Sequence, residues 1–419
     1  MNNSKTQPHP IGFKELLALV ALTMSLVAMS IDIMLPALHA MGQDLGVTQE
    51  NDFQEIITIF LLGFAAGQLV YGPLADRHGR KPWLLAGLGL YCLASVSTLF
   101  VDSFSLILLC RFVQGVGTAA ARVIPIAIVR DCYVGTQMAR MMSFVIMVFV
   151  IVPIFAPAIG QGILWFGSWH MIFLFLLADA ALLMAWIALR LPETLHPQYR
   201  RAISLKVLWE ACRLTVYTRQ SMGYTVAMAL LYGCLMTYIA NAAQIFKDIY
   251  QLDGQDFPLA FGVIAATLIP ASYTNAHWVG QLGLRRLSHA ALLSFVLGCA
   301  GLALWSLIAP PSLITFCAMM SATLFFFAWT FPNFNALAME PLGSIAGTAA
   351  SFIGFFVTAL AAVLAWGIGQ AFNGTVIPLA LGFALFSSSA LLTVWWTEQR
   401  KLFQFATDIW TRKTGQRDQ

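Results

Sequence analysis

The sequence GPLADRHGRKP, residues 72–82, lies between two long apolar runs and decides how the chain around it folds. Glycine permits tight turns and close helix contact, and it stands at Gly72 and Gly79. Basic residues concentrate in the cytoplasmic loops of membrane proteins, and here they are Arg77, Arg80 and Lys81. The stretch therefore predicts a short cytoplasmic turn between two membrane-spanning helices. Asp76 would need a partner if it is buried in this turn; the alternative is a solvated loop that only sets topology.

The composition of the whole chain agrees with a membrane protein. Of its 419 residues, 59% are hydrophobic and only 10% are charged, whereas soluble domains carry about 25% charged residues. So few charges exclude a single soluble domain, a nucleic-acid binder and a disordered protein. The cysteines are too sparse and uneven for a secreted disulfide scaffold, and we expect no disulfides. The apolar residues recur in long runs, which indicate a helical bundle and not a transmembrane barrel.

Twelve apolar runs are long enough to span a membrane, for which a helix needs about 20 residues. They lie near residues 15–38, 53–75, 82–101, 104–128, 138–162, 168–190, 221–246, 257–279, 288–309, 312–336, 344–371 and 375–397. The first run is too long for a cleavable signal peptide and contains Asp32, so we interpret it as the first span.

The basic residues predict the orientation of these spans. If both termini lie in the cytoplasm, 20 of the 23 Lys and Arg residues fall on inner segments. Of the other three, Lys247 lies in an outer loop, and Arg111 and Arg122 lie within the fourth span. The outer loops are acidic instead, with Asp44, Glu50, Asp52, Glu55, Asp248, Asp253 and Asp256. The basic charge thus indicates topology and contact with anionic lipid, not nucleic acid.

The longest cytoplasmic connection, residues 191–220, divides the spans into six and six. Its periodicity predicts a short amphipathic helix from Ser204 to Thr218. We therefore predict an all-α integral membrane protein with two six-helix bundles, residues 1–190 and 221–397. Residues 398–419 would form a cytoplasmic tail.

A faint internal repeat makes the two bundles pseudo-symmetric. Gly79 corresponds to Gly283, and the basic pair after Gly79 is echoed one residue later by Arg285 and Arg286. A doubled six-span unit is typical of secondary transporters, whose substrate site lies near the membrane midplane between the halves.

Several stretches carry a resemblance to a known family. They are GPLADRHGRKP, DIMLP at 32–36, RFVQG at 111–115, VRD at 129–131, PIFAPAIGQG at 153–162, SWHMIF at 168–173 and LPETL at 191–195. The first closely resembles motif A of the major facilitator superfamily. Together they resemble its twelve-span drug:H⁺ antiporters, in particular the bicyclomycin/chloramphenicol-resistance (Bcr/CflA) branch. The resemblance implies a multi-pass protein of the bacterial inner membrane that exports small lipophilic compounds, driven by the proton gradient and without a cofactor.

The chain departs from the pattern of that branch at a few positions. Gln161 replaces the second of the paired glycines that usually end the antiporter motif of the fifth span. Gly280 stands where a second copy of motif A would have Asp. Arg122 and Asp179 are charges that are not typical of the branch. The last departure leaves the substrate and the mechanism open.

Four ionisable residues lie inside the predicted spans, all in the first half: Asp32, Arg111, Arg122 and Asp179. Such residues are costly in a membrane and usually face the bundle interior or a wet cavity. Counted from the outer span ends, Asp32 and Arg111 both lie roughly 9–10 Å deep at about 1.5 Å per residue. We therefore expect them to pair, with Asp32 loading and releasing the proton. The alternative is a static ion pair that only joins spans one and four.

The other two intramembrane charges each allow alternative interpretations. Arg122 follows Arg111 by close to three helical turns and shares its helix face. It either snorkels to the cytoplasmic surface or binds an anionic group. Asp179 lies in the middle of span six, and we expect a protonated, lipid-adjacent or hydrogen-bonded carboxyl in preference to a second proton site.

The fifth span contains the residues that the resemblance assigns to the antiporter motif, Pro153, Pro157, Gly160 and Gly162. Proline interrupts the backbone hydrogen bonds and glycine permits close contact, so this helix should be bent and tightly packed. In the family the motif limits proton leak between the halves, whereas the alternative is ordinary packing.

Adaptable methionine, aromatic and amide side chains on central spans are candidates for a cavity that binds lipophilic substrates. The residues that we expect to line it are Met147, Tyr232, Tyr238, Asn241, Gln244, Trp329, Phe331, Asn333 and Asn335. The alternative is that these side chains face lipid.

Motif A supplies one further prediction. In the superfamily, its Asp caps the start of span eleven and pairs with a basic residue of span four when the protein is open outward. The resemblance therefore implies that Asp76 pairs with Arg130 and approaches the backbone at about 343–347, where helix N–H groups lack partners.

Other chemistry is not indicated by the sequence. It has no Walker A sequence for ATP, no metal-binding spacing of His or Cys, and no nucleophile and base pattern of an enzyme. We expect a monomeric transporter that is no enzyme and whose partners are lipophilic substrates, protons and membrane lipids. The alternatives are a transporter of one metabolite, a facilitator without proton coupling, and a membrane enzyme or sensor.

Overall fold

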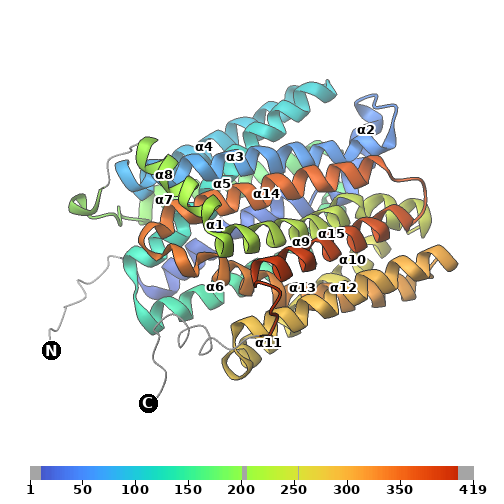
Figure 1. Cartoon of the computed structure of the whole chain (residues 1–419). Helices are drawn as coiled ribbons and strands as arrows, with labels where there is room; N and C mark the ends of the chain where they lie inside the picture. Colours follow the sequence, from blue (N-terminus) through green and yellow to red (C-terminus); the bar gives the residue numbers. More distant parts are fainter. Residues whose placement is uncertain (1–10, 201–204, 253, 404–419) are drawn as a thin grey trace, which may run out of the picture. The chain divides into compact units, whose positions relative to one another are not determined.

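Helices account for all regular structure in the described part of the chain (Figure 1). The computed structural model describes residues 11–200, 205–252 and 254–403. Among these residues, twelve helical segments are long and apolar enough to cross a membrane. The predicted all-α architecture with twelve spans is therefore confirmed. Most of the predicted C-terminal tail, from 404 onward, lies outside the described residues.

The chain divides into two compact units. Unit 1 comprises the residues up to Val47 together with Ile59–Val207. Unit 2 comprises Thr48–Thr58 and the residues from Leu208 onward. The short segment 48–58, between the first two spans, thus packs with the second half of the chain, which the sequence did not lead us to expect.

Unit 1 contains most of the first six spans. Its helices are α1 (Phe13–Asp32), η1 (Leu35–Ala37), α2 (Leu38–Asp44), the greater part of α3 (Glu55–His78), α4 (Arg80–Ser97), η3 (Thr98–Phe100), α5 (Phe104–Cys132), α6 (Gly135–Leu164), α7 (His170–Arg190) and η4 (Pro197–Tyr199). The first span is discontinuous, because α1 ends at Asp32. Pro36 has no N–H to donate to the Asp32 carbonyl, so the α-helical ladder stops there and resumes in α2.

Unit 2 contains the other six spans. Its helices are η2 (Glu50–Gln54), α9 (Arg219–Gln244), η5 (Ile245–Ile249), α10 (Asp256–Ala266), α11 (Leu268–Leu282), α12 (Leu284–Ile308), α13 (Leu313–Met339), η6 (Glu340–Ile345), α14 (Ala346–Gln370) and α15 (Ile377–Thr397). The eighth span is also interrupted, at Thr267 between α10 and α11. Pro270 cannot donate to the carbonyl of Ala266, which explains the break.

The connection between the two halves of the sequence contains α8 (Leu205–Tyr217). This confirms the predicted amphipathic helix to within a residue at each end. Ala211 and Thr215, one turn apart, are buried, whereas Trp209 and Tyr217 are exposed. One residue, Thr218, separates α8 from α9.

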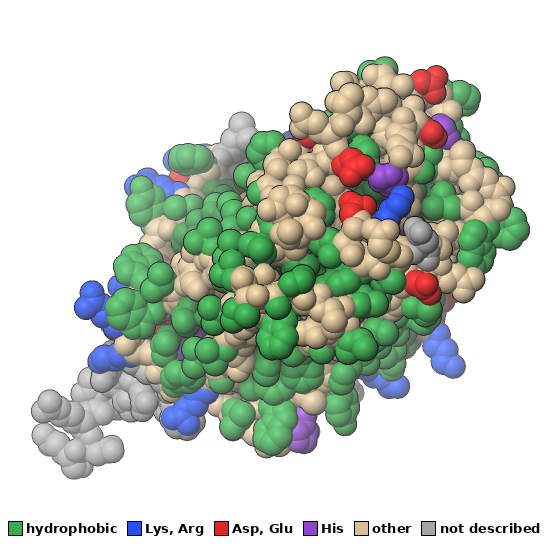
Figure 2. Space-filling view, turned by 90° about the vertical axis from the view of Figure 1, so that its right-hand side faces the viewer, with side chains coloured by type: hydrophobic (Ala, Val, Ile, Leu, Met, Phe, Trp, Pro, Cys, Tyr) green, Lys and Arg blue, Asp and Glu red, His purple; other side chains and the backbone are tan. Residues whose placement is uncertain are grey.

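Large apolar side chains are exposed along the spans. Leu182 on α7 and Ile308 on α12, for example, leave most of their surface uncovered. Extended exposed apolar surface marks a region that meets another apolar phase, here the lipid. Figure 2 shows broad hydrophobic areas on one face of the protein, with Asp and Glu side chains gathered in its upper right part.

Candidate functional site

Asp32 occupies the helix break of the first span. It is the last residue of α1, its side chain is only 2% exposed, and its Oδ1 atom is buried without a hydrogen-bond partner. Discontinuous membrane helices are the usual place for coupling-ion sites, because the break leaves backbone groups available. DIMLP therefore encodes both the carboxyl and the interruption that presents it.

Arg111 lies at the centre of a buried polar chain that ties α5 to α1 and α4. Its Nη2 donates to the carbonyl of Ser30 at 3.1 Å, and its Nη1 donates to Gln114 Oε1. The Gln114 amide donates to Ser95 Oγ at 2.8 Å, and Ser30 Oγ lies 2.7 Å from the Tyr91 hydroxyl. The guanidinium also covers the ring of Phe60, 4.4 Å from its centroid.

The predicted pairing of Asp32 with Arg111 is not observed. In the described part of the chain, no ion pair joins the two residues. The sequence predicts that the first span ends near residue 38, whereas its helical path continues through α2 to Asp44, so Asp32 lies farther from the outer end than the prediction assumes. Arg111 instead binds the backbone two residues before Asp32, so it holds α1 next to the break.

One glycine of the predicted antiporter motif packs directly against this break. A Cβ atom at Gly160 of α6 would lie 2.1 Å from the Ile33 carbonyl and 3.2 Å from Pro36 Cγ. A Cβ at Gly162 would meet nothing within 4 Å. Both prolines of the motif, Pro153 and Pro157, lie inside α6. The motif therefore contacts Ile33, the residue that follows Asp32. Of the two glycines, only Gly160 lies where a larger side chain would clash with α1.

Motif A forms an ion-pair cluster centred on Arg80. This side chain pairs with Asp76, one helical turn earlier, and its Nε donates to Asp131 Oδ2 at 2.8 Å. The predicted Asp76–Arg130 pair is therefore replaced by Asp76–Arg80, because Arg80 is buried within reach of both carboxylates. Arg130 is exposed and forms no ion pair among the described residues.

Glu193, from the LPETL stretch, completes this cluster. Its Oε1 accepts from the backbone N–H groups of Arg80 at 2.8 Å and Leu195 at 2.9 Å, and its Oε2 accepts from Lys81 N–H at 3.2 Å. The carboxylate therefore caps the N-terminus of α4, where helix N–H groups lack partners. Gly79 is required here, since its φ is +114° and a Cβ would lie 2.4 Å from Glu193 Oε2. The VRD and LPETL stretches contain Asp131 and Glu193, but their sequence gives no signal of these contacts.

The remaining motif A residues lie at the edge of this cluster. Gly72 is half-buried in α3, and Arg77 is exposed at the end of the same helix. The Lys81 ammonium donates to the carbonyl of Ala188 at 2.8 Å, which joins α4 to the end of α7.

Unit 2 contains a corresponding cluster around Arg285. Its Nη2 lies 3.0 Å from Glu340 Oε2, and its Nε lies 3.2 Å from Glu398 Oε1. The Tyr224 hydroxyl donates to Glu398 at 2.6 Å and lies 3.0 Å from His289 Nε2. Gly283, with φ of +80°, precedes α12 as Gly79 precedes α4. The sequence offered the signal of Arg285 but not its partners, which come from the ends of α13 and α15.

The two other intramembrane charges, Arg122 and Asp179, are half-buried within unit 1. Asp179 lies on α7, which packs against α4, and its carboxyl is within electrostatic reach of Tyr91. Its role as a protonated, lipid-adjacent or hydrogen-bonded carboxyl stays a prediction.

Several predicted cavity residues have partners inside unit 2. Tyr238 is buried and stacks on Phe261, with 5.5 Å between ring centroids. Asn333 Nδ2 donates to Asn275 Oδ1 at 2.9 Å. The Trp329 indole donates to Thr274 Oγ1 at 3.0 Å, and the Asn241 amide donates to the Thr237 carbonyl at 2.8 Å.

The other candidates are less enclosed, with one exception. Tyr232 and Phe331 are half-buried and contact each other, with 5.5 Å between centroids, and Met147 and Asn335 are exposed. The exception, Gln244, accepts from Gln54 Nε2 at 2.9 Å and donates to the Glu50 carbonyl at 3.1 Å. Contact of these nine residues with substrate stays a prediction.

The residues that the structure describes contain no group of three or more His, Cys, Asp or Glu that could hold a metal ion. Among the described residues of unit 1, the buried charged side chains are Asp32, Arg111 and the Arg80 side chain of the motif A cluster.

Comparison with known proteins agrees with this arrangement. Residues 20–366 match the family model described as Major Facilitator Superfamily. The chain is 29% identical over 351 residues to a bicyclomycin resistance protein homolog of Haemophilus influenzae, covering 82% of this chain and 87% of that protein. It is 28% identical over 346 residues to multidrug resistance protein D of Escherichia coli, covering 81% and 84% of the two chains.

Solved structures resemble the chain in fold. A D-xylose–proton symporter superposes with a TM-score of 0.73 at 13% identity, and covers 90% of this chain and 96% of its own. At that identity, the likeness bears on the arrangement of helices alone.

Proposed function

Because the chain belongs to the Major Facilitator Superfamily, we propose that it exports small lipophilic compounds across the bacterial inner membrane in exchange for protons. Relatives that align over most of the chain are named for resistance to bicyclomycin and to multiple drugs. Another relative, 28% identical over 302 residues, is a chloramphenicol resistance protein of Pseudomonas aeruginosa. These names support lipophilic antibiotics as the substrate class, and the proton gradient as energy source is our inference.

The observation that carries the proposal is the Asp32 carboxyl in the break of the first span. A buried carboxyl with an unpartnered oxygen is stable when it is protonated and costly when it is ionised in a membrane. It therefore releases its proton only in a conformation that admits water to the break. A carboxyl that changes charge with access can couple proton movement to alternating access.

Arg111 supports this cycle without pairing with the carboxyl. By binding the Ser30 carbonyl, it fixes the last turn of α1 against α5. Gly160 fixes the other side, where α6 contacts the Ile33 carbonyl. We infer that both contacts keep the break closed to water until the surrounding helices move.

The predicted orientation and cavity belong to the same proposal. Both termini face the cytoplasm, supported by the placement of 20 of 23 basic residues on inner segments. We infer that the protein acts as a monomer and that its substrate contacts the half-buried Tyr232 and Phe331, whose rings lie 5.5 Å apart in unit 2.

The experiment measures transport by the purified protein in proteoliposomes. With an acidic lumen, wild-type protein should take up radiolabelled chloramphenicol and release protons, and a protonophore should abolish both signals. Asp32→Asn should abolish gradient-driven uptake, because an amide cannot cycle a proton. Asp32→Glu should retain coupling, with an altered pH dependence.

Asp102→Asn is the matched control, because Asp102 is an exposed loop aspartate of the same half. It should transport as the wild type does. Gradient-driven uptake by Asp32→Asn at the wild-type rate would refute the coupling role. Uptake that ignores the gradient in every variant would instead indicate a facilitator.

A further inference from the structure

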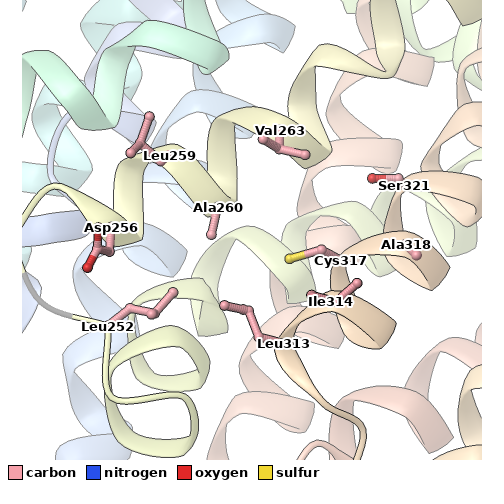
Figure 3. A pocket seen from close by; sticks show the side chains of 10 residues that line it. All are labelled: Leu252, Asp256, Leu259, Ala260, Val263, Leu313, Ile314, Cys317, Ala318 and Ser321. Carbon is pink, nitrogen blue, oxygen red and sulfur yellow. The ribbon is translucent and has the colours of Figure 1, made fainter.

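Unit 2 has a groove of about 560 Å³ on its surface between α10 and α13 (Figure 3). Leu259, Val263 and Ile314 form its rims and are 65%, 60% and 81% exposed. Small side chains form its floor, and Figure 3 shows Ala260 and the Cys317 sulfur directed into the space between the two helices. An exposed apolar hollow between two of the twelve apolar spans is what a surface in contact with lipid tails is expected to show.

The depth of the groove matches one leaflet. Along α10 it extends from Asp256 to Val263, about 10 Å at 1.5 Å per residue. Along α13 it extends from Leu313 to Ser321, about 12 Å by the same rise. Both helices begin at this end of the groove, so its mouth lies at headgroup level. Half of a hydrocarbon core is about 15 Å thick, and the groove therefore spans most of one leaflet.

Among the described residues that line the groove, one is charged, Asp256 in the first turn of α10, and it lies at the mouth. Asp256 is exposed and has no hydrogen bond or ion pair to another described residue. A carboxylate at headgroup level attracts an amine and repels an anionic headgroup. The lining contains no aromatic ring on which a flat drug could stack, which favours an alkyl chain as the occupant.

We propose that this groove binds a phospholipid with a primary-amine headgroup, one acyl chain in the hollow and the ammonium on Asp256. The occupant is thus phosphatidylethanolamine and not phosphatidylglycerol. This site is separate from Asp32 and does not depend on the transport mechanism.

Native mass spectrometry of the full-length protein tests the headgroup preference. The detergent-solubilised protein is given equal amounts of phosphatidylethanolamine and phosphatidylglycerol with identical acyl chains. Wild-type protein should retain the amine lipid in excess, by about threefold to fivefold, as expected for one partly exposed ion pair. Asp256→Asn should bind both lipids equally, whereas the control Asp102→Asn should keep the preference. Equal binding by wild type, or an unchanged preference in Asp256→Asn, would overturn the assignment.

The acyl-chain site needs a second readout. Ala318→Phe or Ala260→Phe, each of which fills the floor, should lower retention of both lipids. If these variants fold poorly, occupancy of the groove can be tested on the wild-type protein by labelling its cysteines with a maleimide. Peptide mass analysis then measures how fast each cysteine reacts. Labelling of Cys317 should slow when the amine lipid is added, while Cys110, half-buried on α5, should react as before. Unchanged Cys317 labelling, or protection by chloramphenicol in place of lipid, would overturn the proposal.

Discussion

Single residues in this chain acquire their roles from what they bind and not from their charge alone. Asp32 and Arg111 are both fully buried, and electrostatics alone suggests that they pair. The guanidinium instead satisfies the Ser30 carbonyl and Gln114, which leaves the carboxyl with an unbonded oxygen. An arginine that neutralised Asp32 permanently would oppose proton uptake, so its placement on the backbone suits a carboxyl that must change charge.

Arg80 and Arg77 provide a test at the same scale. Both belong to motif A, but Arg80 is buried between Asp76 and Asp131, whereas Arg77 is exposed. Arg80→Ala leaves two carboxylates without their cation, and we expect a loss of roughly 2 kcal/mol in stability with slower transport. Arg77→Ala should keep the melting temperature and the transport rate of the wild type. Melting temperatures of the purified variants check this, and equal values for the two would contradict the cluster.

At the scale of helices, proline determines where two spans are interrupted. Pro36 ends α1 at Asp32, and Pro270 separates α10 from α11. The consequences differ, because only the first break contains a buried carboxyl. Proline does not interrupt every span, since Pro125 lies inside α5 and Pro153 lies inside α6. The break at Pro36 is distinguished by the ionisable residue that it presents.

Packing of α6 against α1 distinguishes two glycines of one motif. Gly160→Ala places a methyl group 2.1 Å from the Ile33 carbonyl, so the helices must separate, at a cost of about 1–3 kcal/mol. Gly162→Ala meets no atom within 4 Å and should be tolerated. Expression level, melting temperature and proton-driven uptake should fall for the first variant only. If Gly160→Ala and Gly162→Ala were tolerated equally, close packing of α6 against Ile33 would be refuted.

At the scale of the whole molecule, each unit contains one arginine held by two acids at the ends of its spans. The Arg80 side chain pairs with Asp76 and Asp131, and the Arg285 side chain, 205 residues later, pairs with Glu340 and Glu398. The faint sequence repeat thus preserves a cluster even where Gly280 replaces the motif A aspartate. Each arginine thus pairs with two acids, but the acids come from different positions in the two units.

The charge distribution predicts the topology of the entire chain. A fluorescent protein fused to the C-terminus should fluoresce, because it folds in the cytoplasm. Alkaline phosphatase fused after Asp102, between the third and fourth spans, should be active because it reaches the periplasm. Fusion of the phosphatase after Tyr199, in the connection between the sequence halves, should be inactive and serves as the control. Active phosphatase at Tyr199 would reverse the proposed orientation.

The sequence by itself determined the helical class, the spans, the amphipathic α8 and the turn at Gly79. Each of these follows from local properties, namely apolar run length, hydrophobic period and the backbone freedom of glycine. The partner of Arg111, the cap supplied by Glu193 and the cluster around Arg285 were decided by tertiary structure. The contacts of Arg111 with Ser30, of Glu193 with Arg80 and of Arg285 with Glu398 join residues 81 to 113 positions apart, and Arg285 and Glu340 are 55 positions apart. Only the packing of helices, set by close approaches such as Gly160 to Ile33, brings these groups within hydrogen-bonding distance.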